Sequence, residues 1–262
     1  MLDAASARDI ALEVGAIAAR ELMAGWQNAG PVRTKEYDTD LVTEWDTRIE
    51  ATIDRELGAR APGVAILGEE LGGGGSRTGE RWVVDPVDGT VNFAHGLPIF
   101  GISIGFERDG EPEAGVVVAP VLGWTWAAAR GHGATRNGVP LQVSSTARLE
   151  DAMLTTGFPY DRKQSSRNNF DAFAHLQLVA GAVRRLGAAS LDLCFVASGW
   201  LDGYWELKLK AWDLSAGAVI VREAGGRVTG LSGEPFVSES GEIVATNGRV
   251  HDALLAELAG RV

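Results

Sequence analysis

Residues 81–93 read Arg81-Trp-Val-Val-Asp-Pro-Val-Asp-Gly-Thr-Val-Asn-Phe93, an apolar run that stops abruptly in a turn rich in carboxylates. Three consecutive apolar residues, 82–84, predict a short buried β-strand. Asp85 and Asp88 follow it three residues apart, with Pro86 stiffening the backbone between them. This stretch therefore predicts a strand that delivers two carboxylates into one tight turn.

The turn that begins at Asp85 is suited to two kinds of ligand. Gly89 permits a backbone conformation that other residues resist, and Thr90 can then open a short helix. The side chains of Asp85 and Asp88 and the Val87 carbonyl offer hard oxygen ligands of the kind that Mg²⁺ prefers. Backbone N–H groups at a helix N-terminus can also hold a phosphate. An ordinary Asp-Gly hairpin turn explains the same residues without any ligand.

Helices and strands alternate through the rest of the chain. Apolar residues at helical spacing predict helices over residues 3–25, 43–57, 169–180, 188–198, 213–223 and 249–260. Short apolar runs predict strands over residues 64–67, 99–107, 114–119, 122–129, 183–186 and 243–245. The glycine run at 72–75 predicts a mobile loop. We expect one catalytic domain, 1–262, in which a soft boundary near 140–150 separates lobes of about 1–145 and 146–262.

Composition and charge limit the classes of function. The 262 residues are 45% hydrophobic, which is typical of a globular protein with a substantial core. The formal net charge of −11 argues against nucleic acid or an anionic membrane as the main partner. With one cysteine, no long apolar run and no signal-peptide pattern at the N-terminus, we expect a cytoplasmic protein. A phosphate substrate would be repelled by so acidic a chain unless bound cations reversed the local field.

Each acidic residue that could serve a site also has a purely structural explanation. Asp46 completes a capping box with Thr43, and Asp213 fits a helix N-cap; on spacing alone, capping is favoured for both. Glu69 can be half of a solvated pair with Glu70. Glu206 could serve only to pair with Lys208 or Lys210.

Four segments, in chain order, resemble the inositol monophosphatase family. Residues 85–98, from Asp-Pro-Val-Asp-Gly-Thr to His-Gly-Leu-Pro, resemble its main signature, and Gly-Glu-Glu at 68–70 resembles a shorter one. The stretch from Lys35 to Asp46 and the segment from Trp212-Asp213 to Gly226 resemble two more. The resemblance runs from about residue 8 to the C-terminus. It implies an α/β (α+β) fold, a layered α-β-α-β-α sandwich.

The resemblance also implies a set of metal ligands. The side chains of Glu69 and Asp85 and the Val87 carbonyl would hold a first Mg²⁺. Asp85, Asp88 and Asp213 would hold a second, with Asp85 bridging the two ions, and a third, weaker Mg²⁺ is expected near Glu69. Lithium is the expected inhibitor.

Substrate and catalytic roles follow from the same resemblance. The residues expected to grip the phosphate are Asp88, Gly89 and Thr90. Thr90 paired with Asp46, together with Glu69, would orient and deprotonate the attacking water, with no covalent intermediate. The residues expected to face the alcohol half of the substrate are Gly187, Ala188, Ala189, Glu206 and Asp213.

The expected activity is hydrolysis of a small phosphorylated metabolite, myo-inositol monophosphate first, by a homodimer. Lys210 stands where the animal enzymes have histidine, as in many bacterial members, and Ala188 replaces a frequent Ser or Thr. Both departures weaken the case for inositol phosphate while leaving the ligands intact. Histidinol-phosphate phosphatase and fructose-1,6-bisphosphatase are therefore alternatives. From other classes, a non-catalytic interaction protein on the same fold and a Ca²⁺-binding structural protein remain.

Overall fold

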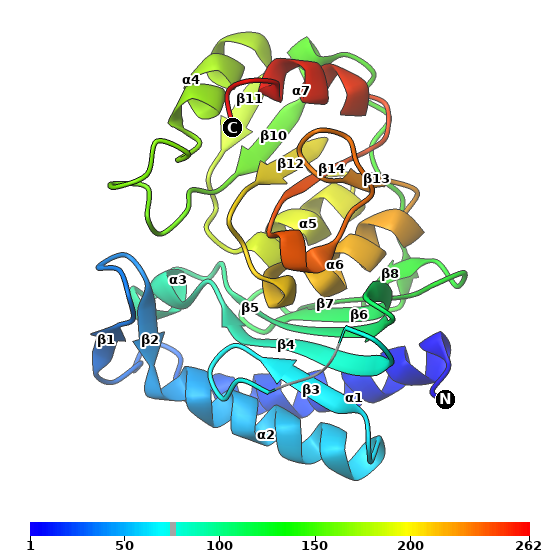
Figure 1. Ribbon diagram of the computed structural model, residues 1–262. Coiled ribbons are helices and arrows are strands. Elements are labelled where there is room, and N and C mark those ends of the chain that lie inside the picture. Colours follow the sequence, from blue (N-terminus) through cyan, green and yellow to red (C-terminus); the bar gives the residue numbers. More distant parts are fainter. Residues whose placement is uncertain (74–76) are drawn as a thin grey trace.

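The computed structural model describes residues 1–73 and 77–262 and consists of five stacked layers of helices and sheets (Figure 1). Its helices are α1 (Ala4–Leu22), α2 (Glu44–Arg60), α3 (Thr90–Ala94), α4 (Phe170–Val179), α5 (Ala189–Ala197), α6 (Ala211–Glu223) and α7 (His251–Leu258). Two single 3-10 turns, η1 (Leu149–Asp151) and η2 (Ser238–Ser240), complete the helical elements.

The strands form two large sheets and one small hairpin. The first sheet has the spatial order of the chain: β3 (Ala65–Gly68), β4 (Glu80–Asp88), β5 (Gly101–Arg108), β6 (Glu111–Ala119), β7 (Trp124–Ala129), β8 (Ala134–Arg136) and β9 (Val139–Pro140). The second has the order β11 (Ala182–Arg184), β10 (Met153–Thr156), β12 (Gly203–Glu206), β14 (Ile243–Thr246) and β13 (Arg227–Thr229). The hairpin pairs β1 (Val32–Thr34) with β2 (Leu41–Thr43).

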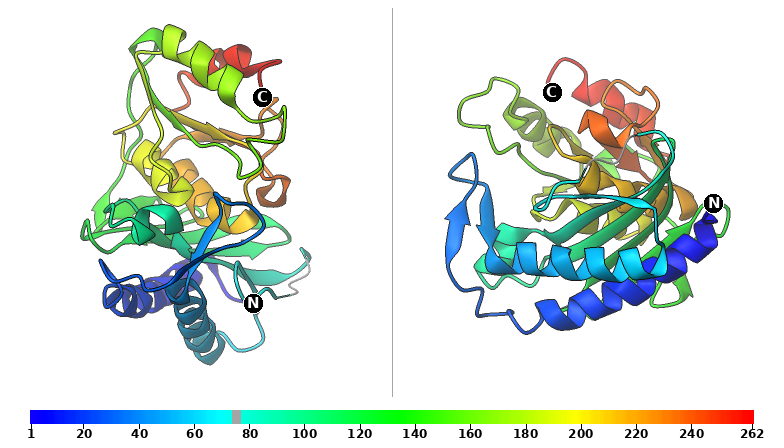
Figure 2. Two further views of the ribbon diagram at one scale, coloured as in Figure 1. Left: turned by 90° about the vertical axis from the view of Figure 1, so that its left-hand side faces the viewer. Right: turned by 60° about the horizontal axis from the view of Figure 1, so that its bottom comes forward.

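The helices cover both sheets, which confirms the predicted α-β-α-β-α layering. Helices α1 and α2 run side by side across the outer face of the first sheet (Figure 2). Helices α5 and α6 fill the space between the two sheets, and α4 and α7 cover the far face of the second. None of the helices in the described residues combines the length and the hydropathy that crossing a membrane requires.

The predicted elements are present with shifted ends, and several short strands were not predicted. The helix expected over 3–25 ends at Leu22, and the strand expected from residue 99 begins at Gly101. Strands β1, β2, β8, β9, β10, β12 and β13 were missed because two to four residues carry too little periodicity to be detected. Of the predicted glycine loop, residues 74–75 lie outside the described residues.

Helix α6 lies directly on the first sheet because two glycines remove the side chains that would separate them. Gly105 and Gly115 are paired across β5 and β6. A methyl group added at Gly115 would lie 2.5 Å from the Ala216 carbonyl oxygen, and one at Gly105 would lie 2.5 Å from Ser215 Oγ. The Ser103 hydroxyl also donates to the Trp212 carbonyl at 3.2 Å. This close contact fixes the first turn of α6, which carries Asp213.

We expect Gly115→Ala to destabilise the protein by about 1–3 kcal/mol, because the added methyl group overlaps the α6 backbone in a packed interior. Gly58→Ala is the matched control, since a methyl group at that exposed position in α2 meets nothing within 4 Å. It should leave stability unchanged or raise it by about 0.4–1 kcal/mol. Urea unfolding monitored by circular dichroism measures both. Equal stability of Gly115→Ala and wild type would contradict the proposed contact.

Candidate functional site

The carboxylate turn leaves the first sheet at a break in strand pairing. The register between β4 and β5 shifts between Asp85 and Asp88, a bulge that turns both side chains out of the regular ladder. Gly89 follows with φ +87°, in the left-handed region, and the space beside its Cα is closed by the Ala188 side chain. Only glycine combines this conformation with this contact. Helix α3 starts at Thr90, as predicted.

Three buried or half-buried carboxylates meet at this turn. Oxygen atoms of Asp85, Asp88 and Asp213 all lie within 4.8 Å of one another. Burial raises the pKa of Asp85 well above its ordinary value, and the nearby charges of Glu69, Asp88 and Asp213 raise it further. The pKa of Asp213 is raised in the same way, by burial first and then by Glu69 and Asp88.

This donor set fits a divalent cation. Carboxylate oxygens are the ligands that hard ions such as Mg²⁺ and Ca²⁺ prefer. A cation among Asp85, Asp88 and Asp213 would relieve both the burial of their charge and their mutual repulsion. The Val87 carbonyl, on the same turn, accepts a hydrogen bond from the Thr90 hydroxyl at 2.9 Å.

Asp88 is held by the first turn of α5. Its carboxylate accepts hydrogen bonds from the backbone N–H of Ala189 at 3.1 Å and of Ser190 at 2.8 Å, and also from the Ser190 hydroxyl. Burial nevertheless raises the pKa of Asp88. Gly187 and Ala188 line the same wall of the cavity. Sequence analysis missed Ser190, whose only signal was a hydroxyl residue in the first turn of a predicted helix.

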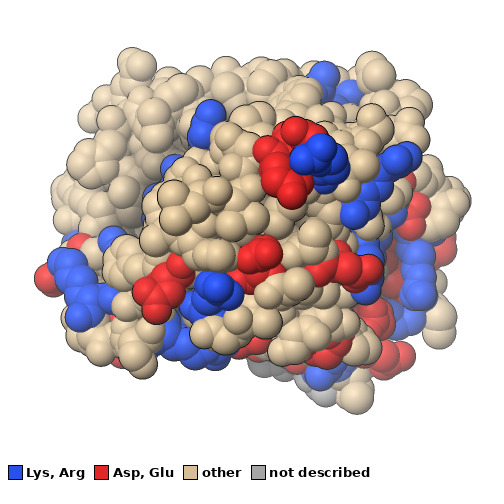
Figure 3. Space-filling model, turned by 90° about the horizontal axis from the view of Figure 1, so that it is seen from above, with Lys and Arg blue, Asp and Glu red and all other residues tan. Residues whose placement is uncertain are grey.

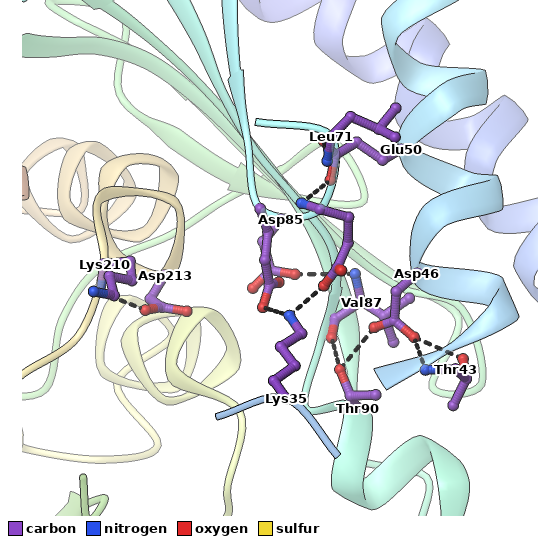
Figure 4. Close-up of polar contacts among 12 residues, drawn as sticks. Lys35, Thr43, Asp46, Glu50, Leu71, Asp85, Val87, Thr90, Lys210 and Asp213 are labelled. Carbon is purple, nitrogen blue, oxygen red and sulfur yellow. Dashed lines mark hydrogen bonds and ion pairs between the residues drawn. The ribbon is translucent and has the colours of Figure 1, made fainter. Parts of the chain in front are cut away.

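Asp46 makes two sets of contacts, one with Thr43 in the capping box and one with Thr90. Its Oδ2 accepts from the Thr43 N–H at 2.8 Å and from the Thr43 hydroxyl at 2.6 Å, which completes the predicted capping box of α2 (Figure 4). Its Oδ1 accepts from the Thr90 hydroxyl at 2.9 Å. The Thr90 hydroxyl has one hydrogen, which it can donate either to the Asp46 carboxylate or to the Val87 carbonyl.

The alternative that Asp213 is an N-cap is wrong. Lys210 is the N-cap of α6, and Asp213 is the third residue of the helix. Asp213 Oδ2 accepts from the Lys210 N–H at 2.6 Å (Figure 4). That bond orients the carboxylate at the helix start and leaves its other oxygen available to the cluster.

Glu69 lies next to the cluster and is bound by a lysine. Lys35 Nζ donates to Glu69 Oε1 at 2.7 Å and also to Glu70, so Lys35 is not a free surface charge. Burial raises the pKa of Glu69 to about 7, although Lys35 acts in the opposite direction. Glu69 and Glu70 are therefore not an ordinary solvated pair.

Glu69, Asp88 and Asp213 line a cavity of about 720 Å³ beside the ends of β4 and β12. The predicted site residues that line it are Glu69, Asp88, Gly89, Thr90, Gly187, Ala188, Ala189, Glu206 and Asp213. The loop between β1 and β2 contacts the loop after β10 beside the cavity, where the Thr39 hydroxyl donates to the Tyr160 carbonyl at 3.0 Å.

Glu206 faces the cavity from the second sheet. The buried Tyr204 hydroxyl donates to Glu206 Oε2 at 2.6 Å. Burial raises the pKa of Glu206 to about 7, and the nearby Arg185 charge partly opposes this. Lys208 pairs with Asp161 at 2.6 Å, so the alternative of a Glu206–Lys208 pair is not what the structure shows. Sequence analysis missed Tyr204.

The cavity lining carries both signs of charge. Its basic residues are Lys35, Arg162, Arg185, Lys208 and Lys210, and its acidic residues are Asp38, Asp40, Glu69, Asp88, Glu206 and Asp213. The face seen from above α4 and α7 also carries intermixed acidic and basic side chains (Figure 3). Bound cations would therefore be needed to offset the carboxylates before a phosphorylated ligand could enter.

Comparisons with known proteins agree on one family. The model of the inositol monophosphatase family matches residues 3–262. The inositol-1-monophosphatase of Synechocystis is 43% identical over 252 residues, which cover 96% of this chain and 88% of that protein. The Nus factor SuhB of Pseudomonas aeruginosa is 41% identical over 256 residues, which cover 95% and 94%.

Solved structures agree with the sequence relatives. The inositol monophosphatase from Anabaena superposes with a TM-score of 0.88 at 38% identity, covering 97% of this chain and 95% of that one. The fold, the buried carboxylates and these relatives together show that the chain belongs to the inositol monophosphatase family and is a phosphoric monoester hydrolase.

Proposed function

We propose that this protein hydrolyses myo-inositol monophosphate to inositol and phosphate with Mg²⁺ as cofactor. The observation that carries the proposal is the meeting of Asp85, Asp88 and Asp213 at the turn before α3, beside a cavity lined by both acidic and basic side chains. The relatives named inositol-1-monophosphatase support the choice of substrate.

Two to three Mg²⁺ ions are proposed, held by the side chains of Glu69, Asp85, Asp88 and Asp213 and by the Val87 carbonyl. When bound, these ions would lower the pKa of the attacking water and neutralise charge on the phosphate and the leaving oxygen.

The protein's own groups would position the phosphate and accept the proton. The Gly89 and Thr90 backbone N–H groups at the start of α3 would bind phosphate oxygens. Thr90, whose hydroxyl donates to Asp46 at 2.9 Å, would orient the water, and Glu69 would take its proton.

The alcohol half of the substrate would lie against Gly187, Ala188 and Ala189 and be hydrogen-bonded by Glu206 and Asp213. Ala188 contributes no hydroxyl, so Glu206 becomes the main polar group on that wall. Histidinol phosphate is the second candidate, because its amine would pair with the Glu206 carboxylate. Fructose 1,6-bisphosphate is a third candidate.

Further proposals concern the whole molecule. The two-lobe division near 140–150 is supported by β9, which ends at Pro140, and β10, which begins the second sheet at Met153. A homodimer stays a prediction from the resemblance to the family. A cytoplasmic location, and partners other than nucleic acid or membrane, stay predictions from composition and charge.

The substrate is tested by phosphate release from inositol 1-phosphate, histidinol phosphate, fructose 1,6-bisphosphate and 3′-phosphoadenosine 5′-phosphate. We expect Mg²⁺-dependent turnover that is fastest on inositol 1-phosphate and is inhibited by Li⁺. Asp85→Asn should lower kcat/KM at least about 100-fold, equivalent to roughly 3 kcal/mol of lost transition-state stabilisation. Asp252→Asn, an exposed residue of α7, is the control. A different best substrate would select one of the alternatives, and no turnover by folded protein would refute the proposal.

The metal site is tested by thermal and urea unfolding with and without Mg²⁺. Mg²⁺ at 100 times its dissociation constant should stabilise wild type by about 2.7 kcal/mol. Asp85→Asn should be at least as stable as wild type without metal, because it removes one of three repelling charges, and should gain much less from Mg²⁺. Asp252→Asn should gain as much as wild type. An equal gain in Asp85→Asn would rule out Asp85 as a ligand.

Glu206 predicts a pH dependence of stability. Its pKa is about 7 when folded and 4.5 ordinarily, so wild-type protein loses stability as pH rises from 4.5 through 7, by about 3 kcal/mol in total. Glu206→Gln cannot ionise and still accepts the Tyr204 hydrogen bond. The free energy of unfolding of the variant, measured with urea in the absence of metal, should therefore rise relative to that of wild type between pH 4.5 and 8. A difference that does not change with pH would contradict the raised pKa.

A further inference from the structure

A second acidic residue of α2, Glu50, is buried without being part of the cluster or the cavity lining. Its side chain is completely inaccessible to solvent. Glu50 Oε2 accepts from the Glu70 N–H at 2.7 Å, and Oε1 accepts from the Leu71 N–H at 2.8 Å (Figure 4). Both carboxylate oxygens are thus used by backbone donors of the loop that follows β3.

The Glu50 carboxylate also occupies the space next to residue 68. A methyl group added at Gly68 would overlap it, so glycine is required where the chain passes over this carboxylate. The same turn is closed by the Gly68 N–H, which donates to the Gly72 carbonyl at 3.2 Å. Glu50 therefore holds the backbone on both sides of Glu69, by contact before it and by two hydrogen bonds after it.

Burying a carboxylate costs several kcal/mol unless hydrogen bonds replace its hydration. An apolar residue at position 50 would extend the α2 stripe of Ile49, Ile53 and Leu57 without that cost, but it would leave the Glu70 and Leu71 N–H groups without this acceptor. A buried carboxylate at position 50 is therefore explained by the backbone on both sides of Glu69 that it holds in place. Without it, the Glu70 and Leu71 donors would be free to turn and Glu69 would move with them.

Helix α2 connects this loop to the catalytic turn. Asp46 and Glu50 are four residues apart and lie one turn from each other on the same face of the helix. Asp46 binds the Thr90 hydroxyl at 2.9 Å, while Glu50 binds the backbone beyond Glu69. One rigid helix thus sets the positions of Thr90 and Glu69 relative to each other.

We infer that Glu50 is a positioning residue that fixes the Glu69 carboxylate against Asp85 and so sets the affinity of the protein for the divalent ion that Glu69 binds. The inference rests on the proposed role of Glu69 as a metal ligand. Glu50 itself touches neither substrate nor ion. Groups that orient metal ligands in this way typically change metal affinity or activity 10–100-fold when they are replaced.

The test is a Mn²⁺ titration of the protein, with free ion counted by electron paramagnetic resonance. Glu69→Gln identifies the binding step that depends on Glu69. Glu50→Gln should weaken that same step about 10–100-fold, because its amide can accept only one of the two N–H groups. Asp54→Asn, a half-buried acid one turn further along α2, is the matched control and should bind Mn²⁺ as wild type does.

Kinetics and hydrogen exchange separate positioning from a loss of fold. In Glu50→Gln the Mg²⁺ concentration for half-maximal turnover should rise at least about 10-fold, while the far-ultraviolet circular dichroism of the protein stays that of wild type. The amide protons of Glu70 and Leu71 should exchange faster in this variant and unchanged in Asp54→Asn. If Glu50→Gln does not fold, Gly68→Ala displaces the same carboxylate from the other side.

Wild-type Mn²⁺ affinity in folded Glu50→Gln, with binding lost in Glu69→Gln, would overturn the inference. An unchanged titration in Glu69→Gln would overturn it as well, together with the assignment of Glu69 as a ligand. The phosphatase assay of the wild-type protein tests the proposed function independently of the Mn²⁺ titration. Protein that binds Mn²⁺ through Glu69 yet hydrolyses no phosphate ester would refute the proposed function and leave the role of Glu50 decided by the titration alone.

Discussion

Repulsion among the carboxylates of Asp85, Asp88 and Asp213 is the force that the surrounding structure has to oppose. Their oxygens lie within 4.8 Å of one another in a site of low solvent access, where like charges interact strongly. Two features hold them in place. The paired glycines Gly105 and Gly115 let α6 approach the first sheet, and the first turn of α5 donates hydrogen bonds to Asp88. Packing and hydrogen bonds of the fold thus offset the electrostatic repulsion within the site.

Helix α2 has a comparable role on the opposite side of the turn. Its acidic residues Asp46 and Glu50 do not belong to the cluster of three, but each binds a segment that carries a site residue. Because Asp46 and Glu50 come from one helix, the carboxylate turn and the loop of Glu69 cannot shift independently. Lys35 then joins Glu69 to Glu70 from the hairpin side. The polar residues of the site are therefore held by α2, by the β1–β2 hairpin and by the first turn of α5.

Local patterns allowed much of this arrangement to be predicted. The strand that ends in Asp85 and Asp88, the glycine that follows and the capping box of α2 all depend on neighbours in the sequence, so spacing alone reveals them. The layered fold and the joining of Asp213 to the turn came from the resemblance to a family. Strands such as β10 and β12 escaped prediction because four residues give no periodicity, and their pairing partners are distant in the chain.

The sequence by itself determined the chemistry on offer: hard carboxylate oxygens, a left-handed glycine and a chain too acidic to attract phosphate without cations. Only the tertiary structure decided how these groups are used. Asp213 was consistent with an N-cap, yet the helix begins earlier and the side chain turns to the cluster. The sequence did not indicate the partners of Ser190 and Glu50, because those partners lie 102 and 20 residues away. Hydrogen bonds between distant segments depend on packing, and packing is a property of the whole fold.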